Sequence, residues 1–279
     1  MRFSIWPSPM EPWSAVKATV QHCEATGWDR AYMSDHFMPS FGDDSGVTNE
    51  CVTFMAGIAA STERIGIASI VLGNTYRHPA VLANQIAGID EISGGRVVLG
   101  LGAGWQENEH DAYGIELGTI KQRLDRFEEA VQIIKGLFRT ERVDFDGEYY
   151  TLTNAPMNPA RADLKLLLGG GGEKRTMRIA AQHADEWNIW STPEEMKHKL
   201  EVLAKHCDDL GRDRKEIEVS TQSWEFLNGD FDVMKRTVEG WAEIGVDEAI
   251  FAGFGLPPVD AGRFDLLDRF NSEIASQYR

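Results

Sequence analysis

The chain lacks long apolar runs and any excess of basic residues. Its 44 acidic residues outnumber its 28 basic residues and give a formal net charge of −16. Such a charge repels nucleic acid and anionic membranes, because both carry negative phosphates. No apolar run approaches the roughly 20 residues that span a bilayer, and no long apolar leader precedes the first predicted strand. We therefore expect a protein that binds neither nucleic acid nor membranes.

Paired cysteines and metal-binding motifs are also missing. Cys23, Cys51 and Cys207 are scattered, odd in number and without C-x-x-C spacing, which is typical of reduced thiols in a cytoplasmic protein. H-E-x-x-H is absent, and Glu109 and His110 stand at no ligand spacing, so no metal site is predicted. The absence of G-x-x-x-x-G-K-[ST] and of G-x-S-x-G excludes a P-loop and an α/β-hydrolase elbow.

What the sequence does contain is a regular alternation of short apolar runs and helical patterns. Residues 97–99 are apolar throughout, as in parallel strands covered by helices on one side and by a barrel interior on the other. The expected strands are Arg2–Trp6, Arg30–Ser34, Ile65–Leu72, Val97–Leu101, Leu164–Leu168, Glu186–Trp190, Glu216–Thr221 and Glu248–Ala252. This pattern predicts an α/β fold, a (β/α)8 TIM barrel, as one domain over residues 1–279. A doubly wound sheet shares the alternation and is the alternative, but no Rossmann fingerprint supports it.

The segment 143–152 departs from this alternation. Its residues alternate with a two-residue period around Asp146-Gly147, a strong hairpin-turn sequence. It predicts a β-hairpin inserted before the fifth barrel strand. Elsewhere Thr192 with Glu195 predicts a capped helix start, and Pro79 predicts another.

In a TIM barrel the chemistry lies at the C-terminal ends of the strands. His36 follows the second strand and could transfer a proton while its neighbour Asp35 fixes its tautomer. The alternative is a loop histidine bonded to a backbone carbonyl. Arg77, after the third strand, could meet an anionic group or pair with a surface carboxylate. Tryptophans at or near later strand ends could line a pocket or simply pack: Trp187, Trp190 and Trp224.

Glycines mark the ends of two further strands. Gly100, Gly102 and Gly104 alternate after the fourth strand and allow close approach of a flat ligand, although Trp105 breaks the dinucleotide pattern. Gly169–Gly172 follows the fifth strand and leads into a helix. Four glycines leave backbone N–H groups exposed, and a helix N-terminus adds positive potential, so we expect a phosphate site rather than a merely flexible turn. A side chain at position 170 should then block the phosphate and leave the fold intact.

Taken in order, these segments resemble the luciferase-like flavin and deazaflavin oxidoreductase superfamily, and more closely its branch that uses coenzyme F420. The residues that carry the resemblance are Ser34-Asp35-His36, Asn74–Pro79, Ser93–Arg96, Gly100–Trp105 followed by Glu109-His110 and Tyr113-Gly114, Arg123 with Arg126, residues 143–150, Gly169–Thr176 and Ala184–Asn188. The resemblance covers nearly the whole chain and weakens beyond about Gly211.

The resemblance implies hydride transfer at a deazaflavin ring held in the barrel mouth, with Asp35, His36 and Trp105 as catalytic residues. The positions expected to bind the cofactor are Asp35, His36, Ser69, Ile70, Gly102, Ala103, Gly104, Asn108, Leu168, Gly169, Gly170, Gly171, Gly172, Arg175 and Trp187. A non-prolyl cis peptide is expected at Ser69-Ile70. The resemblance also suggests a homodimer.

One departure from the family pattern bears on the substrate. Sugar-phosphate dehydrogenases of this superfamily carry a glutamate where this chain has Trp105. The loss of that acid favours a less polar compound, such as an enone, imine or quinone, which would be reduced rather than oxidised. An FMN-dependent monooxygenase is the alternative function within the same fold. A barrel that binds its ligand without catalysis is the third.

Overall fold

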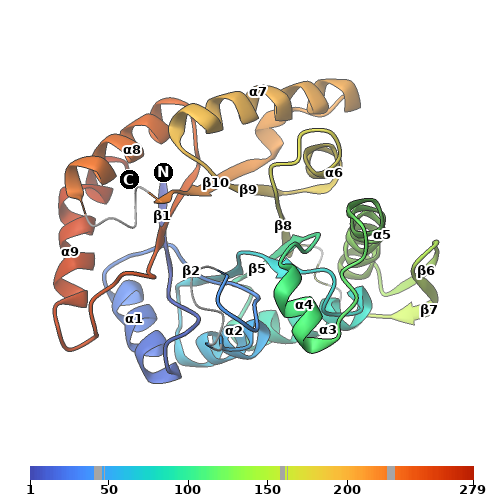
Figure 1. The fold of residues 1–279 in the computed structure, drawn as a ribbon, viewed down its shortest axis with the longest axis horizontal. Helices are drawn as coiled ribbons and strands as arrows, with labels where there is room; N and C mark the ends of the chain where they lie inside the picture. Colours follow the sequence, from blue (N-terminus) through green and yellow to red (C-terminus); the bar gives the residue numbers. More distant parts are fainter. Residues whose placement is uncertain (41–45, 47, 158–160, 162, 225–229) are drawn as a thin grey trace.

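A closed barrel of parallel strands surrounded by helices forms the body of the protein (Figure 1). The computed structural model describes residues 1–40, 46, 48–157, 161, 163–224 and 230–279. Its strands are β1 Arg2–Trp6, β2 Arg30–Met33, β3 Gly66–Ser69, β4 Leu72–Gly73, β5 Val97–Gly102, β8 Lys165–Gly169, β9 Glu186–Trp190, β10 Glu218–Gln222 and β11 Glu248–Ala252. Both β3 and β4 pair with β5, so they are two parts of one barrel strand. In the described part of the chain, the predicted eight-stranded TIM barrel is thus confirmed.

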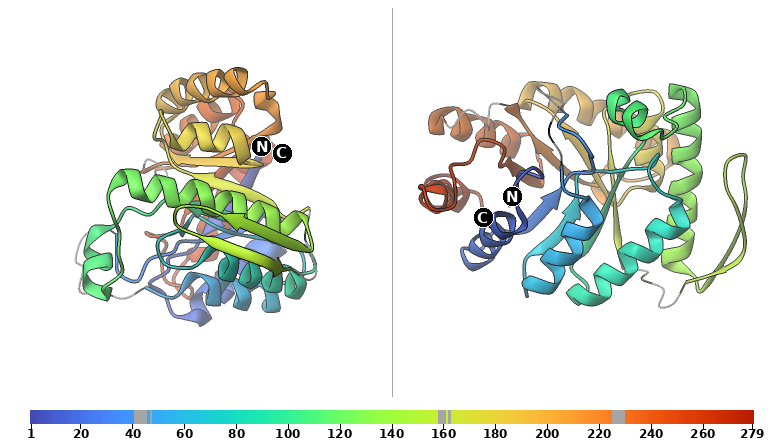
Figure 2. Two further views of the ribbon diagram at one scale, coloured as in Figure 1. Left: turned by 90° about the vertical axis from the view of Figure 1, so that its right-hand side faces the viewer. Right: turned by 60° about the horizontal axis from the view of Figure 1, so that its bottom comes forward.

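Helices follow the strands and cover the outside of the barrel, as Figures 1 and 2 show. They are α1 Trp13–Ala25, α2 Cys51–Ser61, α3 Pro79–Ser93, α4 Glu107–Tyr113, α5 Ile120–Arg139, α6 Thr176–His183, α7 Pro193–Leu210, α8 Phe231–Glu243 and α9 Arg263–Glu273, with short 3-10 turns at Arg214–Glu216 and Ala275–Gln277. The two helix starts predicted from the sequence are confirmed. Thr192 and Glu195 form a capping box on α7, and α3 begins at Pro79. None of the described helices is long and apolar enough to cross a membrane.

Three strands, β1, β9 and β11, have the expected bounds, β2, β5 and β8 differ by one residue, and larger differences occur in the third barrel strand and in β10. β10 begins at Glu218 rather than Glu216, because Arg214–Glu216 forms a 3-10 turn. The third barrel strand is interrupted, and its non-prolyl cis peptide is Ile70-Val71, so the expected position at Ser69-Ile70 is wrong by one residue. The amide of Ile70 still donates to the carbonyl of Met33 at 2.8 Å, which continues the ladder with β2 past Ser69.

The inserted hairpin is formed by β6 Arg142–Asp146 and β7 Thr151–Pro156. It stands off the barrel beyond α5 (Figure 2, right). Its connection is longer than a two-residue turn, because the carboxylate of Glu129 on α5 accepts the backbone N–H groups of Glu148, Tyr149 and Tyr150 at 2.7–3.1 Å. The helix therefore determines the shape of the hairpin end.

The core has two parts, one between the strands and the helices and one inside the barrel. Tyr32, Ile70 and Ile250 belong to the interior cluster. Below it, at the N-terminal end of the barrel, Arg30 lies 2.6 Å from Glu186 and 2.9 Å from Glu248, and all three are buried. Because these charges compensate one another at the end opposite the predicted site, we assign them to the fold.

Candidate active site at the barrel mouth

His36 lies at the mouth of the barrel, just past the C-terminal end of β2, and its partner is a carboxylate that the sequence did not reveal. His36 Nδ1 is 2.8 Å from Oε1 of Glu109 on α4. Glu109 is fully buried and also accepts the amide of Phe37 at 2.8 Å and the hydroxyl of Tyr76. Burial alone would raise the pKa of Glu109, but the hydrogen bonds from His36 and Tyr76 lower it. Glu109 therefore stays ionised, and it orients the imidazole.

Asp35 has a different role from the one expected for it. Arg77 holds its carboxylate with two bonds of 2.6 and 2.9 Å, and the amide of Gly73 donates a third at 2.9 Å. The Asp35 side chain is only 1% exposed. The expectation that Asp35 fixes the tautomer of His36 is therefore wrong in this structure, because its acceptor atoms are taken by other donors. Arg77 also binds Glu50, so it is committed to carboxylates of the chain itself.

Trp105 lies beside His36 on the solvent side of the mouth. The two rings meet edge to face, with their centroids 5.7 Å apart. Trp105 is 55% exposed, whereas the His36 side chain is 18% exposed. The structure thus brings together two of the three predicted catalytic side chains, while the carboxylate of Asp35 binds Arg77 and the amide of Gly73.

The predicted glycines of β5 and β8 surround one side chain, that of Val71. A Cβ built on Gly102 would lie 2.7 Å from a methyl group of Val71, and one on Gly169 would lie 2.8 Å from the other. Such distances leave no room for a side chain at either glycine. Ser69 is buried below, where its hydroxyl exchanges hydrogen bonds with the backbone of Gly100 at 2.8 and 2.9 Å. Val71 therefore packs directly against the glycine backbone at the ends of β5 and β8.

The glycine-rich loop after β8 is partly committed to the protein itself. The amide of Gly170 donates to the carbonyl of Asn188 at 3.0 Å, so it does not face outward as expected. Gly170 has φ +129°, and a Cβ there would lie 2.9 Å from Thr176. A substitution at Gly170 would therefore strain the loop, which corrects the expectation of an intact fold. Within the described residues, the amides of Gly171 and Gly172 have no protein acceptor.

Cations around this loop are held by neighbouring groups. Arg175 pairs with Asp125 at 2.7 Å and Glu128 at 3.1 Å on α5. Lys199 of α7, which the sequence reading missed, lies 2.9 Å from the carbonyl of Gly171. Lys199 thus contacts the loop directly and also pairs with Glu173 at 2.7 Å, while Arg175 connects α6 to α5.

The remaining predicted positions fall at different depths. Trp187 and Leu168 are fully buried toward the helices, and the indole of Trp187 donates to the Gly170 carbonyl at 3.1 Å. They support the loop and have no surface of their own in the mouth. Ala103 is half-buried and Asn108 is exposed, where its side chain accepts the amide of Glu109 at 3.0 Å. In the described ranges, no three His, Cys, Asp or Glu side chains gather as a metal site requires.

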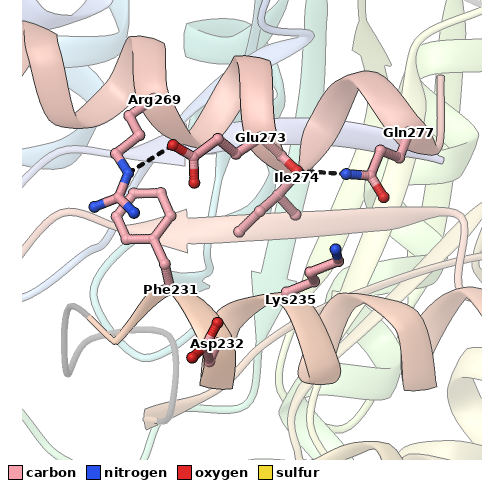
Figure 3. A pocket seen from close by; sticks show the side chains of 7 residues that line it. All are labelled: Phe231, Asp232, Lys235, Arg269, Glu273, Ile274 and Gln277. Atoms are coloured by element: carbon pink, nitrogen blue, oxygen red, sulfur yellow. Dashed lines mark hydrogen bonds and ion pairs between the residues drawn. The ribbon is translucent and has the colours of Figure 1, made fainter.

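A cavity elsewhere is distinct from this site. It has a volume of about 340 Å³ and lies between α8 and α9 on the outside of the barrel (Figure 3). The guanidinium of Arg269 stacks on the ring of Phe231 at 3.9 Å and pairs with Glu273 at 2.8 Å, while Lys235 lies across from them. These side chains satisfy one another and come from helices far from the strand ends that carry His36.

Comparison with known proteins identifies the family. A model of the luciferase-like monooxygenase family matches residues 1–247. The chain belongs to this family. A Microbacterium testaceum protein, F420-dependent glucose-6-phosphate dehydrogenase, is 29% identical over 229 residues, which are 80% of this chain and 67% of that protein.

Two further relatives of this luciferase-like chain show the range of the similarity. Pyrimidine monooxygenase RutA of an Enterobacter species is 34% identical over 184 residues, which are 64% of this chain and 50% of that protein. The coenzyme F420-dependent tetrahydromethanopterin reductase from Methanopyrus kandleri superposes with a TM-score of 0.84 over 100% of this chain and 99% of that chain, at 15% identity. At that identity the superposition establishes the fold alone.

Proposed function

We propose that the protein is an oxidoreductase that uses coenzyme F420 and reduces an unsaturated organic compound. The observation that carries the proposal is the placement of His36, oriented by Glu109, at the barrel mouth where Val71 packs against the glycines that end β5 and β8. The F420-dependent dehydrogenase among its relatives supports the choice of cofactor.

The residues at the mouth fit such a cofactor in two respects. Val71 occupies the space beside Gly102 and Gly169, so a planar ring at the mouth would lie against Val71 rather than against these glycines. Toward the outside, the amides of Gly171 and Gly172, the N-terminus of α6 and Lys199 together offer donors and positive charge to the cofactor phosphate. In this arrangement Gly171 and Gly172 would hold the phosphate, and His36 and Trp105 would flank the ring.

Reduced F420, when bound, supplies a hydride. When a hydride adds to one carbon of a C=C or C=N bond, the π electron pair remains on the other atom and must take up a proton. His36 is the described residue placed to donate that proton, because Glu109 holds its Nδ1 and leaves Nε2 for the substrate. Hydrogen bonds from His36 and Tyr76 lower the pKa of Glu109, and the ionised carboxylate holds the imidazole in one orientation.

The role of His36 is tested by separating affinity from turnover in His36→Ala. We expect oxidised F420 to bind within a few fold of the wild type, while kcat falls on the order of 10²-fold, the scale of general acid catalysis. A large loss of F420 affinity with kcat unchanged at saturation would mean that His36 only positions the ring.

An FMN-dependent monooxygenase is the second candidate, because RutA is among the relatives. A deazaflavin has carbon where a flavin has N5, so it transfers hydride but reacts poorly with oxygen. Oxygen consumption during turnover with FMN would therefore favour this candidate, and its absence with F420 supports the first.

Three further properties are part of the proposal. The whole chain, residues 1–279, acts as one domain, it assembles as a homodimer, and it works in the cytoplasm. Size-exclusion chromatography with light scattering tests the oligomeric state. Trp105 in place of an acid favours a substrate less polar than a sugar phosphate.

A further inference from the structure

Four aromatic side chains gather on one side of the barrel mouth. They follow or end β1, β9, β10 and β11, which are consecutive in the barrel: Trp6, Trp190, Trp224 and Phe254. Trp6 packs against Phe254 with ring centroids 4.6 Å apart and against Trp190 at 5.9 Å, and Trp190 meets Trp224 at 4.5 Å. We call these four residues the aromatic wall.

The aromatic wall faces the strands that carry the candidate active site. The barrel order places β9 across from β2 and β11 across from β5. Trp6 rests on the apolar barrel interior, but Trp224 is 48% exposed and Phe254 is 41% exposed. Exposed large aromatic side chains that cluster at the C-terminal ends of barrel strands are typical of a ligand site.

No charge accompanies the aromatic wall in the described residues around it. Residues 7–10, 191–193, 222–224 and 252–257 contain no Asp, Glu, Lys or Arg. The first charged residue after β1 is Glu11, which pairs with the buried Arg263. An anionic substrate would lose its hydration here without gaining a cation, which costs several kcal/mol.

Two donors in the aromatic wall are unpaired. The indole nitrogens of Trp6 and Trp190 are buried without a hydrogen-bond partner. A buried N–H without an acceptor is unfavourable, and a carbonyl oxygen entering between the rings, with a small movement of the rings, would satisfy one of them.

We propose that the aromatic wall is the substrate subsite and that it takes a flat, uncharged, conjugated carbonyl compound. This inference rests on the proposed function for the reaction, but the binding step is independent of it. Flat rings stack on aromatic side chains with a gain of about 0.5–1.5 kcal/mol for each contact. The wall thereby positions the unsaturated bond of the compound between itself and His36.

Binding of three probes to the protein by calorimetry tests the proposal: menadione, 4-phenyl-3-buten-2-one and glucose 6-phosphate. We expect the first two to bind and glucose 6-phosphate to bind more weakly than either. Trp224→Ala and Phe254→Ala should each weaken menadione binding by about 3- to 10-fold. Both side chains are exposed, so their removal leaves no buried cavity and thermal stability should stay near that of the wild type.

Phe231→Ala is the matched control, because this aromatic lies in the cavity between α8 and α9 (Figure 3). It should leave menadione affinity unchanged. Three results would overturn the proposal. They are unchanged menadione affinity in both wall variants, a loss of affinity in Phe231→Ala alone, and no binding of either carbonyl probe. If F420 does not bind but the wall variants bind menadione more weakly, the proposed cofactor is wrong and the substrate subsite is supported. If F420 binds but the wall variants leave menadione affinity unchanged, only the proposed subsite is wrong.

Discussion

Glu109 Oε1 lies 2.8 Å from His36 Nδ1, although 73 residues separate the two in the chain. α4 carries the carboxylate and the end of β2 carries the imidazole, so the pair forms only once β2 and β5 lie on either side of β3. Because Glu109 is fully buried, its charge acts on His36 with little screening by solvent. The structure makes Glu109 a positioning residue for His36.

Glu109→Gln should therefore lower kcat more than it lowers cofactor affinity. The amide keeps the size of the side chain and one acceptor but removes the charge and weakens the hydrogen bond that orients the imidazole. We expect a decrease of kcat of about 10-fold or more, with the Kd for F420 within a few fold. An unchanged kcat would assign Glu109 to the fold alone.

Gly171→Val tests the phosphate loop more cleanly than a change at Gly170. A Cβ at Gly171 would be 3.6 Å from Ile189 and 3.9 Å from Lys199, which are ordinary contacts. We expect affinity for F420 to fall by about 10-fold or more because the side chain covers the loop amides, with little change in melting temperature. Gly88→Ala, in open space on α3, is the control and should bind F420 like the wild type. Equal affinities in both variants would remove the loop from the cofactor site.

Arg77→Met should destabilise the fold. The substitution leaves the Asp35 carboxylate buried without its two bonds from the guanidinium. Breaking a buried ion pair on one side costs about 3–5 kcal/mol, so we expect a loss of this order in the free energy of unfolding measured with urea. Lys121→Met is the control, because Lys121 is 76% exposed in its pair with Asp125. Its effect should be much smaller, because an exposed ion pair contributes little, and similar losses in the two variants would contradict this account of Asp35.

His183, at the end of α6, should make stability depend on pH. Burial, helped by the nearby charge of Lys135, lowers its pKa from 6.5 to about 4. As pH falls from 6.5 to 4, the unfolded chain binds a proton that the folded protein does not, so stability decreases over this range, by on the order of 2–3 kcal/mol. His183→Gln should reduce the loss between pH 7 and pH 5 in urea unfolding. The two proteins should behave alike between pH 7 and pH 8, and equal losses below pH 7 would show that the histidine is not the cause.

The sequence predicts the barrel well because each strand is a local apolar run. β1, β9 and β11 begin and end where the sequence pattern places them. The position of the cis peptide after Ile70 cannot be predicted from the sequence, because the composition of this segment does not mark it. The hairpin was predicted, but its connection depends on Glu129, a side chain from another element.

The sequence predicts where the site lies in the barrel, but not which side chains pair with one another there. His36 and the glycines stand at strand ends, which the fold itself identifies. Their partners come from elsewhere in the chain: Glu109 for His36 and Arg77 for Asp35. The opposite orientations of Trp187 and Trp190 follow from the sequence, because strand residues alternate between faces and these two are three residues apart. Trp187 therefore points toward the helices and Trp190 toward the barrel interior.

The most direct test of the account is the affinity of the protein for oxidised F420 and for FMN, measured separately by calorimetry under the same conditions. We expect F420 to bind at least about ten times more tightly than FMN, a difference of about 1.4 kcal/mol in binding free energy. Equal affinities, or tighter binding of FMN, would contradict the proposed use of F420 and leave the barrel and its mouth as described.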